Sequence, residues 1–360
     1  MKWIMTSCWL LFTAFMAVAQ APLKTENVVI VTLDGMRWQE VFGGVDETLM
    51  NDSVFNPNRK RVREKFWAPT ADGRRKKLFP FLWSTVAQQG QLYGNRWQNN
   101  RLDNANPYWF SYPGYSEMFT GYADTTINSN DKIANPNENV LEFINKQQGY
   151  AGKVAAFTTW DVFPYILNSK RSGVYVNADV DTLRFNTPGL QLVNDMQLLT
   201  TRPIGVRPDI FTYMAGREYL KACKPKLLYI AFDETDDFAH HGLYDQYLGS
   251  AHAEDAMIGD LWKTLQLMPQ YKDKTTLIVT CDHGRGDTVK STWKDHGSSI
   301  TDAHELWLAV IGPDTSPAGE IKAAGQLYQR QIAATVAKLL GFNFTANHPV
   351  AAPMISIYKK

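Results

Sequence analysis

The feature that most constrains the fold is a series of short, almost continuous apolar runs. They cover residues 27–33, 153–157, 226–232, 276–281 and 306–311. A strand with one solvated face alternates apolar and polar residues, whereas a continuous run suits a strand that is covered on both faces, as in a parallel sheet. Between the runs, apolar residues recur at three- and four-residue steps, which predicts helices over residues 244–265 and 326–340. The alternation predicts an α/β fold: a doubly wound, mostly parallel central sheet with helices on both faces.

Residues 51–106 interrupt this pattern, and we interpret them as an irregular insertion. They contain two basic runs, at residues 59–65 and 74–77, together with Trp67, Trp83 and Trp97. The basic side chains of these runs either form a solvated surface or line one side of a site and attract anionic substrates. Hydrophobic residues make up 44% of the 360 residues, which excludes a disordered chain. With no repeat or linker in view, residues 20–360 are expected to form a single catalytic domain.

The first 19 residues are typical of a secretory signal peptide. Lys2 precedes an apolar stretch at residues 8–18, and Ala17-Val18-Ala19 offers a small-residue cleavage site. The stretch is short for a membrane span, and a membrane anchor is the alternative interpretation. We therefore expect cleavage after Ala19, a secreted or periplasmic protein, and no membrane span after cleavage.

The charge balance and the cysteine content bear on the binding partners and on disulfide bonds. The 37 Lys and Arg nearly cancel the 36 Asp and Glu, so no binding to a nucleic-acid polymer is expected. Loss of the signal peptide leaves Cys223 and Cys281, which flank apolar runs. We expect two buried free thiols there rather than a disulfide.

Acidic residues and histidines follow three of the predicted strands. They are Asp34 after the first run, Asp236, Asp237, His240 and His241 after the third, and Asp282 and His283 after the fourth. Ligand sites of open α/β sheets lie beyond the carboxyl ends of the strands, so these groups are expected to converge. Clustered carboxylates repel one another unless a cation lies among them. Asp and His ligands without thiolates favour Zn²⁺, with Mn²⁺ or Fe as alternatives.

Ser111 is the candidate nucleophile. It lies in the sequence WFSYPGYSEMFTG, residues 109–121, where a helix could begin after a turn. A serine at a helix N-terminus is well placed for activation and for contact with an anionic phosphoryl group. The alternative is an ordinary turn residue beside Pro113.

In their order along the chain, these motifs resemble the alkaline phosphatase superfamily, and most closely its nucleotide pyrophosphatase/phosphodiesterase branch. The matching segments are VTLDGMRW, SYPGYSEMFTG, DDFAH, DHGRG and DHGSS, followed by LWLAVIGP, and they extend over residues 27–313. Each motif is short, but five in the same order make a specific pattern.

The resemblance implies a two-metal site and a phosphoseryl mechanism. One metal ion would be held by Asp236, His240 and His296, and the other by Asp34, Ser111, Asp282 and His283. It implies two divalent ions, with Zn²⁺ as the expected metal. The implied function is an exported hydrolase of small phosphorylated substrates, either phosphomonoesters or phosphodiesters and nucleotide pyrophosphates, with Ser111 as the nucleophile.

The sequence departs from that branch in three places. Ser111 replaces a threonine, Gly114-Tyr115 replaces Asn-His, and the asparagine that contacts the phosphoryl oxygen has no match in register. Asn130 is the nearest candidate for substrate binding. Asp237 with His241 repeats the spacing of Asp236 with His240, and His304 is an alternative to His296; we prefer the pair with Asp236, and His296 because Gly297 follows it.

Two other functions compete with this interpretation. A sulfatase or phosphonate esterase of the same superfamily would share the metal site, but Tyr115 stands where the sulfatase motif has arginine. A non-catalytic metal- or phosphate-binding protein is the alternative from another class. The oligomeric state is left open.

Overall fold

The computed structural model describes residues 23–184, 187–202 and 204–358. The predicted signal peptide, with its cleavage site after Ala19, lies outside the described residues. Among the described residues, no helix combines the length and the apolar character that crossing a bilayer requires.

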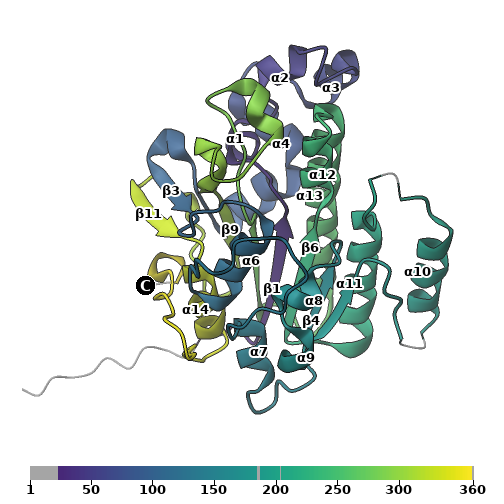
Figure 1. The fold of residues 1–360 in the computed structure, drawn as a ribbon, viewed down its shortest axis with the longest axis vertical. Helices are drawn as coiled ribbons and strands as arrows, with labels where there is room; N and C mark the ends of the chain where they lie inside the picture. The colour runs from purple at the N-terminus through teal and green to yellow at the C-terminus, as the bar shows by residue number, and fades with distance from the viewer. Residues whose placement is uncertain (1–22, 185–186, 203, 359–360) are drawn as a thin grey trace, which may run out of the picture.

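The protein has a mixed α/β fold built on an eight-stranded sheet, which confirms the predicted class (Figure 1). Strand β1 (Asn27–Leu33) lies between β6 (Leu227–Phe232) and β7 (Thr275–Thr280) and runs parallel to both. Strands β4 (Val154–Thr158) and β5 (Tyr175–Ala178) extend the parallel part. Four of the five apolar runs therefore form parallel strands, within one or two residues of the predicted bounds.

The fifth run differs from the prediction. Residues 306–311 split into β8 (Glu305–Leu306) and β9 (Leu308–Ile311), and β9 is antiparallel to β7. The reason lies in the connection, where the chain after β7 forms two short 3-10 helices, at Lys290–Lys294 and Thr301–His304, and no crossover helix. Without a crossover the chain stays at the same edge of the sheet, so the next strand must run back. Strands β2 (Gln91–Tyr93) and β10 (Gly319–Glu320) complete the sheet beyond β9.

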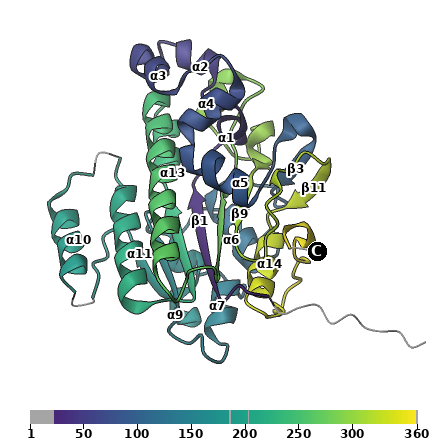
Figure 2. The same ribbon diagram turned by 180° about the vertical axis from the view of Figure 1, so that it is seen from behind.

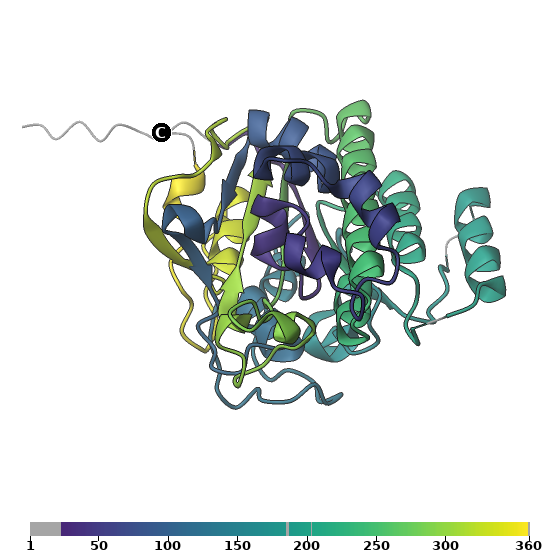
Figure 3. The ribbon, with the colours of Figure 1, turned by 90° about the horizontal axis from the view of Figure 1, so that it is seen from above.

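Helices cover both faces of the sheet. One layer contains α6 (Ser111–Thr120), α7 (Val140–Asn145) and α14 (Gln331–Leu339), seen in front in Figure 1. The other contains α11 (Asp209–Cys223) and α13 (Tyr244–Leu267), which come to the front in Figure 2. Helix α10 (Pro188–Leu199) lies outermost, beyond α11, as the view from above shows (Figure 3). The predicted helix over residues 244–265 is α13.

Two further expectations need correction. Residues 51–106 are not irregular throughout, because they form α3 (Arg59–Phe66), α4 (Ala71–Leu78), β2 and β3 (Asn100–Asp103). These elements are short, and α4 buries only Leu78, so they leave little apolar periodicity in the sequence. The predicted helix over residues 326–340 divides into β11 (Gly325–Tyr328), which pairs with β3, and α14.

The basic runs and the cysteines follow the predictions in part. The charged side chains of α3 are exposed, as expected of a solvated basic face. Arg74 stacks over Trp67, and Arg75 lies 3.5 Å from the ring centre of Trp83. Both cysteines are free thiols, but Cys281 is fully buried whereas Cys223 is half-buried.

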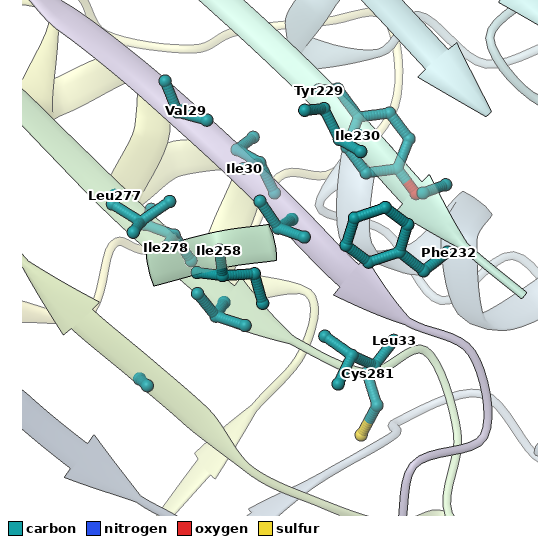
Figure 4. Close-up of a cluster of buried hydrophobic side chains, with 14 of the residues drawn as sticks. Val29, Ile30, Leu33, Tyr229, Ile230, Phe232, Ile258, Leu277, Ile278 and Cys281 are labelled. Carbon is teal, nitrogen blue, oxygen red and sulfur yellow. The ribbon is translucent and has the colours of Figure 1, made fainter. Parts of the chain in front are cut away.

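The core explains why the apolar runs are continuous. Every residue of β1 is buried, and Val29 and Ile30 lie beside Ile230 of β6 and Ile278 of β7 (Figure 4). Because helices cover the sheet on both sides, successive side chains of one strand are all removed from water, and none of them needs to be polar.

Truncation of this core should destabilise the protein. Ile30→Ala is expected to lower the free energy of unfolding by roughly 2–5 kcal/mol, because a fully buried side chain leaves a cavity. Ile133→Ala, at a position 66% exposed, should change it by no more than about 0.5 kcal/mol. Urea unfolding of both variants measures the difference, and equal losses would contradict the assignment of the core.

Candidate active site

Three loops at the carboxyl ends of β1, β6 and β7 bring the predicted acidic residues together. Asp34 follows β1, Asp236 lies in α12 (Glu234–His240) after β6, and Asp282 and His283 follow β7. The Nε2 atom of His283 lies 3.3 Å from Asp34 Oδ1, 3.7 Å from Asp236 Oδ1 and 3.5 Å from Asp282 Oδ2. Residues more than 200 positions apart in the sequence thus form one cluster.

A second group shares Asp236 with the first. His240 Nε2 lies 3.1 Å from Asp236 Oδ2 and 2.9 Å from His296 Nε2. The ring of His296 also lies against that of His283, with 4.1 Å between the ring centres. In each group, Asp236–His240–His296 and Asp34–Asp236–His283, potential ligand atoms lie within 4.8 Å of one another. Asp236 is therefore the carboxylate that connects the two.

Unpartnered atoms in this cluster fit a bound cation. Asp34 Oδ1 and Asp282 Oδ2 are buried, and no hydrogen bond satisfies either of them. His283 Nε2 is the basic atom that faces both, at 3.3 and 3.5 Å. Buried polar atoms are nearly always satisfied, so two such oxygens in one place leave room for a further positive partner. Asp and His side chains at these separations are suitable ligands for Zn²⁺ or a similar divalent ion.

The electrostatics of the cluster favour positive charge at its centre. Burial raises the pKa of Asp282 to about 8, and the neighbouring Asp34 adds to the rise. Burial acts to lower the pKa of His283, but the Asp282 and Asp34 carboxylates outweigh it and raise the pKa to about 9. The charge is supplied by an imidazolium or by a metal ion, whose binding would release the His283 proton.

Ser111 lies at the edge of this cluster, at the first position of α6. Its Oγ is 3.4 Å from His283 Nε2. The helix comes this close to the sheet because residue 114 is glycine: a Cβ there would lie 2.5 Å from the Asp282 carbonyl oxygen. The Asn130 side chain accepts a hydrogen bond from the Tyr112 N–H at 2.9 Å, so it caps the same helix end. Its predicted role in substrate binding stays a prediction.

The geometry distinguishes between the alternatives left open by the sequence. His241 turns its Nδ1 to the Asp237 carbonyl, 2.8 Å away, and belongs to neither group of potential ligands. His304 packs on Trp109, with 5.0 Å between the ring centres, and its Nδ1 lies 2.7 Å from the Thr301 carbonyl. Asp236, His240 and His296 do lie together, and their preference as metal ligands stays a prediction.

Sequence reasoning missed two residues that contact the proposed ligands. The Tyr115 hydroxyl donates a 2.9 Å hydrogen bond to Asp34 Oδ2. The Arg285 guanidinium donates to the Asp236 carboxylate. Both lie inside motifs that the sequence singled out, one turn after Ser111 and two residues after His283. Their places within these motifs are the only indication of a role that the sequence offers, because the residues they contact are distant in the sequence.

Comparisons with known proteins identify the family of the chain. A family model described as type I phosphodiesterase / nucleotide pyrophosphatase matches residues 42–340, which is most of the chain. A search of curated proteins finds no matching sequence.

Several solved structures share the fold. A phosphonate monoester hydrolase from Silicibacter pomeroyi is 14% identical, with a TM-score of 0.58 over 92% of this chain and 76% of that one. The lipoteichoic acid synthase LtaP from Listeria monocytogenes is 15% identical, with a TM-score of 0.55 over 89% and 73%. A mutant of the alkaline phosphatase PafA is 10% identical, with a TM-score of 0.59 over 95% and 100%. Identities this low establish similarity of fold only.

The contact between Tyr115 and Asp34 can be tested by removing one atom. Tyr115→Phe keeps the buried ring but leaves Asp34 Oδ2 without its donor, so zinc affinity should fall by about 10–100-fold. Competition with a chromophoric chelator measures this affinity.

Tyr112→Phe is the matched control. It removes a hydroxyl that donates to the Ile133 carbonyl, on the same helix but away from the acidic cluster. Zinc affinity should stay unchanged in that variant. Equal affinities in the two variants would contradict a role for Tyr115 in orienting Asp34.

Proposed function

The chain belongs to the type I phosphodiesterase / nucleotide pyrophosphatase family, within the alkaline phosphatase superfamily, and from this premise we propose that it hydrolyses phosphate esters through Ser111. The observation that carries the proposal is the position of the Ser111 hydroxyl, 3.4 Å from His283 in a buried cluster of potential metal ligands. A binding protein without catalysis would not require a nucleophile at that position.

The proposal includes two divalent cations, with Zn²⁺ as the metal. Asp236, His240 and His296 would hold one, and Asp34, Ser111, Asp282 and His283 the other. Bound in this way, the ions supply positive charge for the attacking and leaving oxygens of an in-line displacement. Asp236 lies within reach of both groups, which suits two ions bound close together.

The residues of the chain then have separate tasks. Ser111 Oγ forms a bond to phosphorus, the ester alcohol leaves, and water hydrolyses the resulting phosphoserine. Because Ser111 opens α6, the positive end of the helix dipole would face the phosphoryl oxygens. Gly114 permits this approach, and the exposed His240 marks the open side of the site, where substrate enters.

Phosphate esters fit better than sulfate esters. The side chain at position 115, where the sulfatase motif has arginine, is a tyrosine that is buried and hydrogen-bonded to Asp34. The shared fold makes a phosphonate monoester the second candidate substrate, as one similar structure is a phosphonate monoester hydrolase. We also propose that the protein is exported, with its signal peptide cleaved after Ala19.

Substitution of the nucleophile tests the catalytic role directly. Ser111→Ala should lower turnover by on the order of 10³–10⁶-fold, because the covalent step loses its attacking oxygen. The bound metal should remain largely in place, since the histidine and aspartate ligands are unchanged. Ser116→Ala, on the same helix but bonded to Asn135, serves as the control and should keep its turnover. Full activity in Ser111→Ala would overturn the assignment.

Metal removal tests the cofactor. Dialysis against a chelator should abolish hydrolysis, and Zn²⁺ should restore it, because the carboxylate cluster requires a cation. The substrates are p-nitrophenyl phosphate and bis-p-nitrophenyl phosphate, whose relative rates also separate monoesterase from diesterase activity. Activity that survives prolonged chelation would contradict the metal-dependent mechanism, and hydrolysis of neither ester would favour the binding protein.

A further inference from the structure

Arg285 is a fully buried cation inside the candidate site, with 1% of its surface exposed. Its guanidinium donates hydrogen bonds through Nε to the Gly35 carbonyl at 3.1 Å and through Nη1 to the Lys294 carbonyl at 2.7 Å. The third nitrogen, Nη2, donates to the Asp236 carbonyl at 3.2 Å and to the Asp236 carboxylate. Three nitrogens thus contact three separate segments.

Each of these contacts is next to a proposed metal ligand. Gly35 follows Asp34, Asp236 is itself a ligand, and Lys294 stands two residues before His296. These segments come from the loop after β1, from α12 and from the chain between β7 and β9. Arg285 itself follows His283 by two residues. The three connections that carry proposed ligands from the ends of β1, β6 and β7 therefore meet at one guanidinium.

The packing around the guanidinium leaves it little freedom. A Cβ added to Gly35 would lie 2.8 Å from Arg285 Nε, 2.9 Å from Arg285 Nη2 and 2.8 Å from Asp236 Oδ1. Gly35 also has φ of +57°, a backbone conformation that disfavours other residues. The backbone of the β1 loop therefore lies directly against the guanidinium and fixes its plane.

We propose that Arg285 is a positioning residue that holds Asp236 in place relative to Asp34 and His296. Asp236 is a proposed ligand of one metal ion, and its carboxylate also lies 3.7 Å from His283, a proposed ligand of the other. Through this placement Arg285 sets the affinity of the site for metal. The inference rests on the proposed function, because it concerns the metal site on which that function depends.

Two effects of Arg285 on metal affinity oppose each other. Its positive charge repels a cation, whereas its hydrogen bonds organise the ligands before the cation binds. A lysine keeps the charge, but its single ammonium cannot bridge three segments as a planar guanidinium does. R285K therefore removes the hydrogen bonds that connect the three segments but keeps the positive charge. A change in zinc affinity in this variant reports on the positioning of the ligands alone.

The test removes bound metal from the protein with a chelator and then titrates the protein with Zn²⁺, with the heat of binding measured by calorimetry. In R285K the dissociation constant of at least one zinc site should rise by about 10–100-fold over the parent, the usual effect of losing a residue that orients a ligand. A dissociation constant within twofold of the parent at every site would overturn the inference. Should R285K not fold, R285Q takes its place. Its loss of the repelling charge favours zinc binding, so a dissociation constant that still rises supports the inference, and one that does not rise would overturn it.

R207K is the matched control. Arg207 is also fully buried and bridges several groups, donating to Asn177, to the Thr158 carbonyl and to Thr212, but it touches none of the proposed ligands. Its substitution should lower thermal stability and leave zinc affinity unchanged. Equal losses of zinc affinity in R207K and R285K would show a general effect of disturbing a buried arginine and would overturn the inference.

Zinc binding and hydrolysis are measured separately, so the two proposals can fail independently. A parent protein that binds zinc but cleaves neither nitrophenyl ester overturns the proposed function and leaves Arg285 as a positioning residue for a metal site. If the parent protein hydrolyses the esters and R285K binds zinc as tightly as the parent does, only the proposed role of Arg285 is overturned.

Discussion

Mutual repulsion among buried carboxylates at the carboxyl edge of the sheet is the constraint on which the rest of the structure depends. Asp34, Asp236 and Asp282 lie around one histidine. Asp34 and Asp282 are fully buried and Asp236 is mostly buried, so their charges are poorly screened by water. Such a cluster persists only if positive groups are built in or bound. The fold supplies Arg285 and the imidazole of His283, and the carboxylate oxygens without a hydrogen bond would suit the proposed metal ions beyond these.

The scaffold that holds this cluster is rigid because it is apolar. Strands β1, β6 and β7 are buried along their whole length, and each ends where a charged loop begins. Helix α6 brings Ser111 to the same place, and its glycine at position 114 lets it lie directly against Asp282. Catalysis requires positions accurate to a fraction of an ångström, and here they come from strands and a helix rather than from loops alone.

Much of this architecture could be predicted from the sequence, since burial on both faces leaves continuous apolar runs and strand ends converge by topology. The predicted fold class and the resemblance to the superfamily are confirmed. Five of the predicted ligand residues, namely Asp34, Asp236, His240, His283 and His296, lie close to one another, and their role as ligands stays a prediction. The direction of β9 could not be predicted, because it depends on a missing crossover helix and not on the strand itself. The contacts of Tyr115 and Arg285 were likewise hidden, because each joins residues far apart in the sequence.

Anomalous X-ray diffraction at the zinc absorption edge, from crystals grown with Zn²⁺, would show whether this cluster binds two metal ions beside a nucleophilic serine. We expect two anomalous peaks, one among Asp236, His240 and His296 and one among Asp34, Asp282, His283 and Ser111. No peak in the cluster, or zinc bound only at other residues, would contradict this expectation.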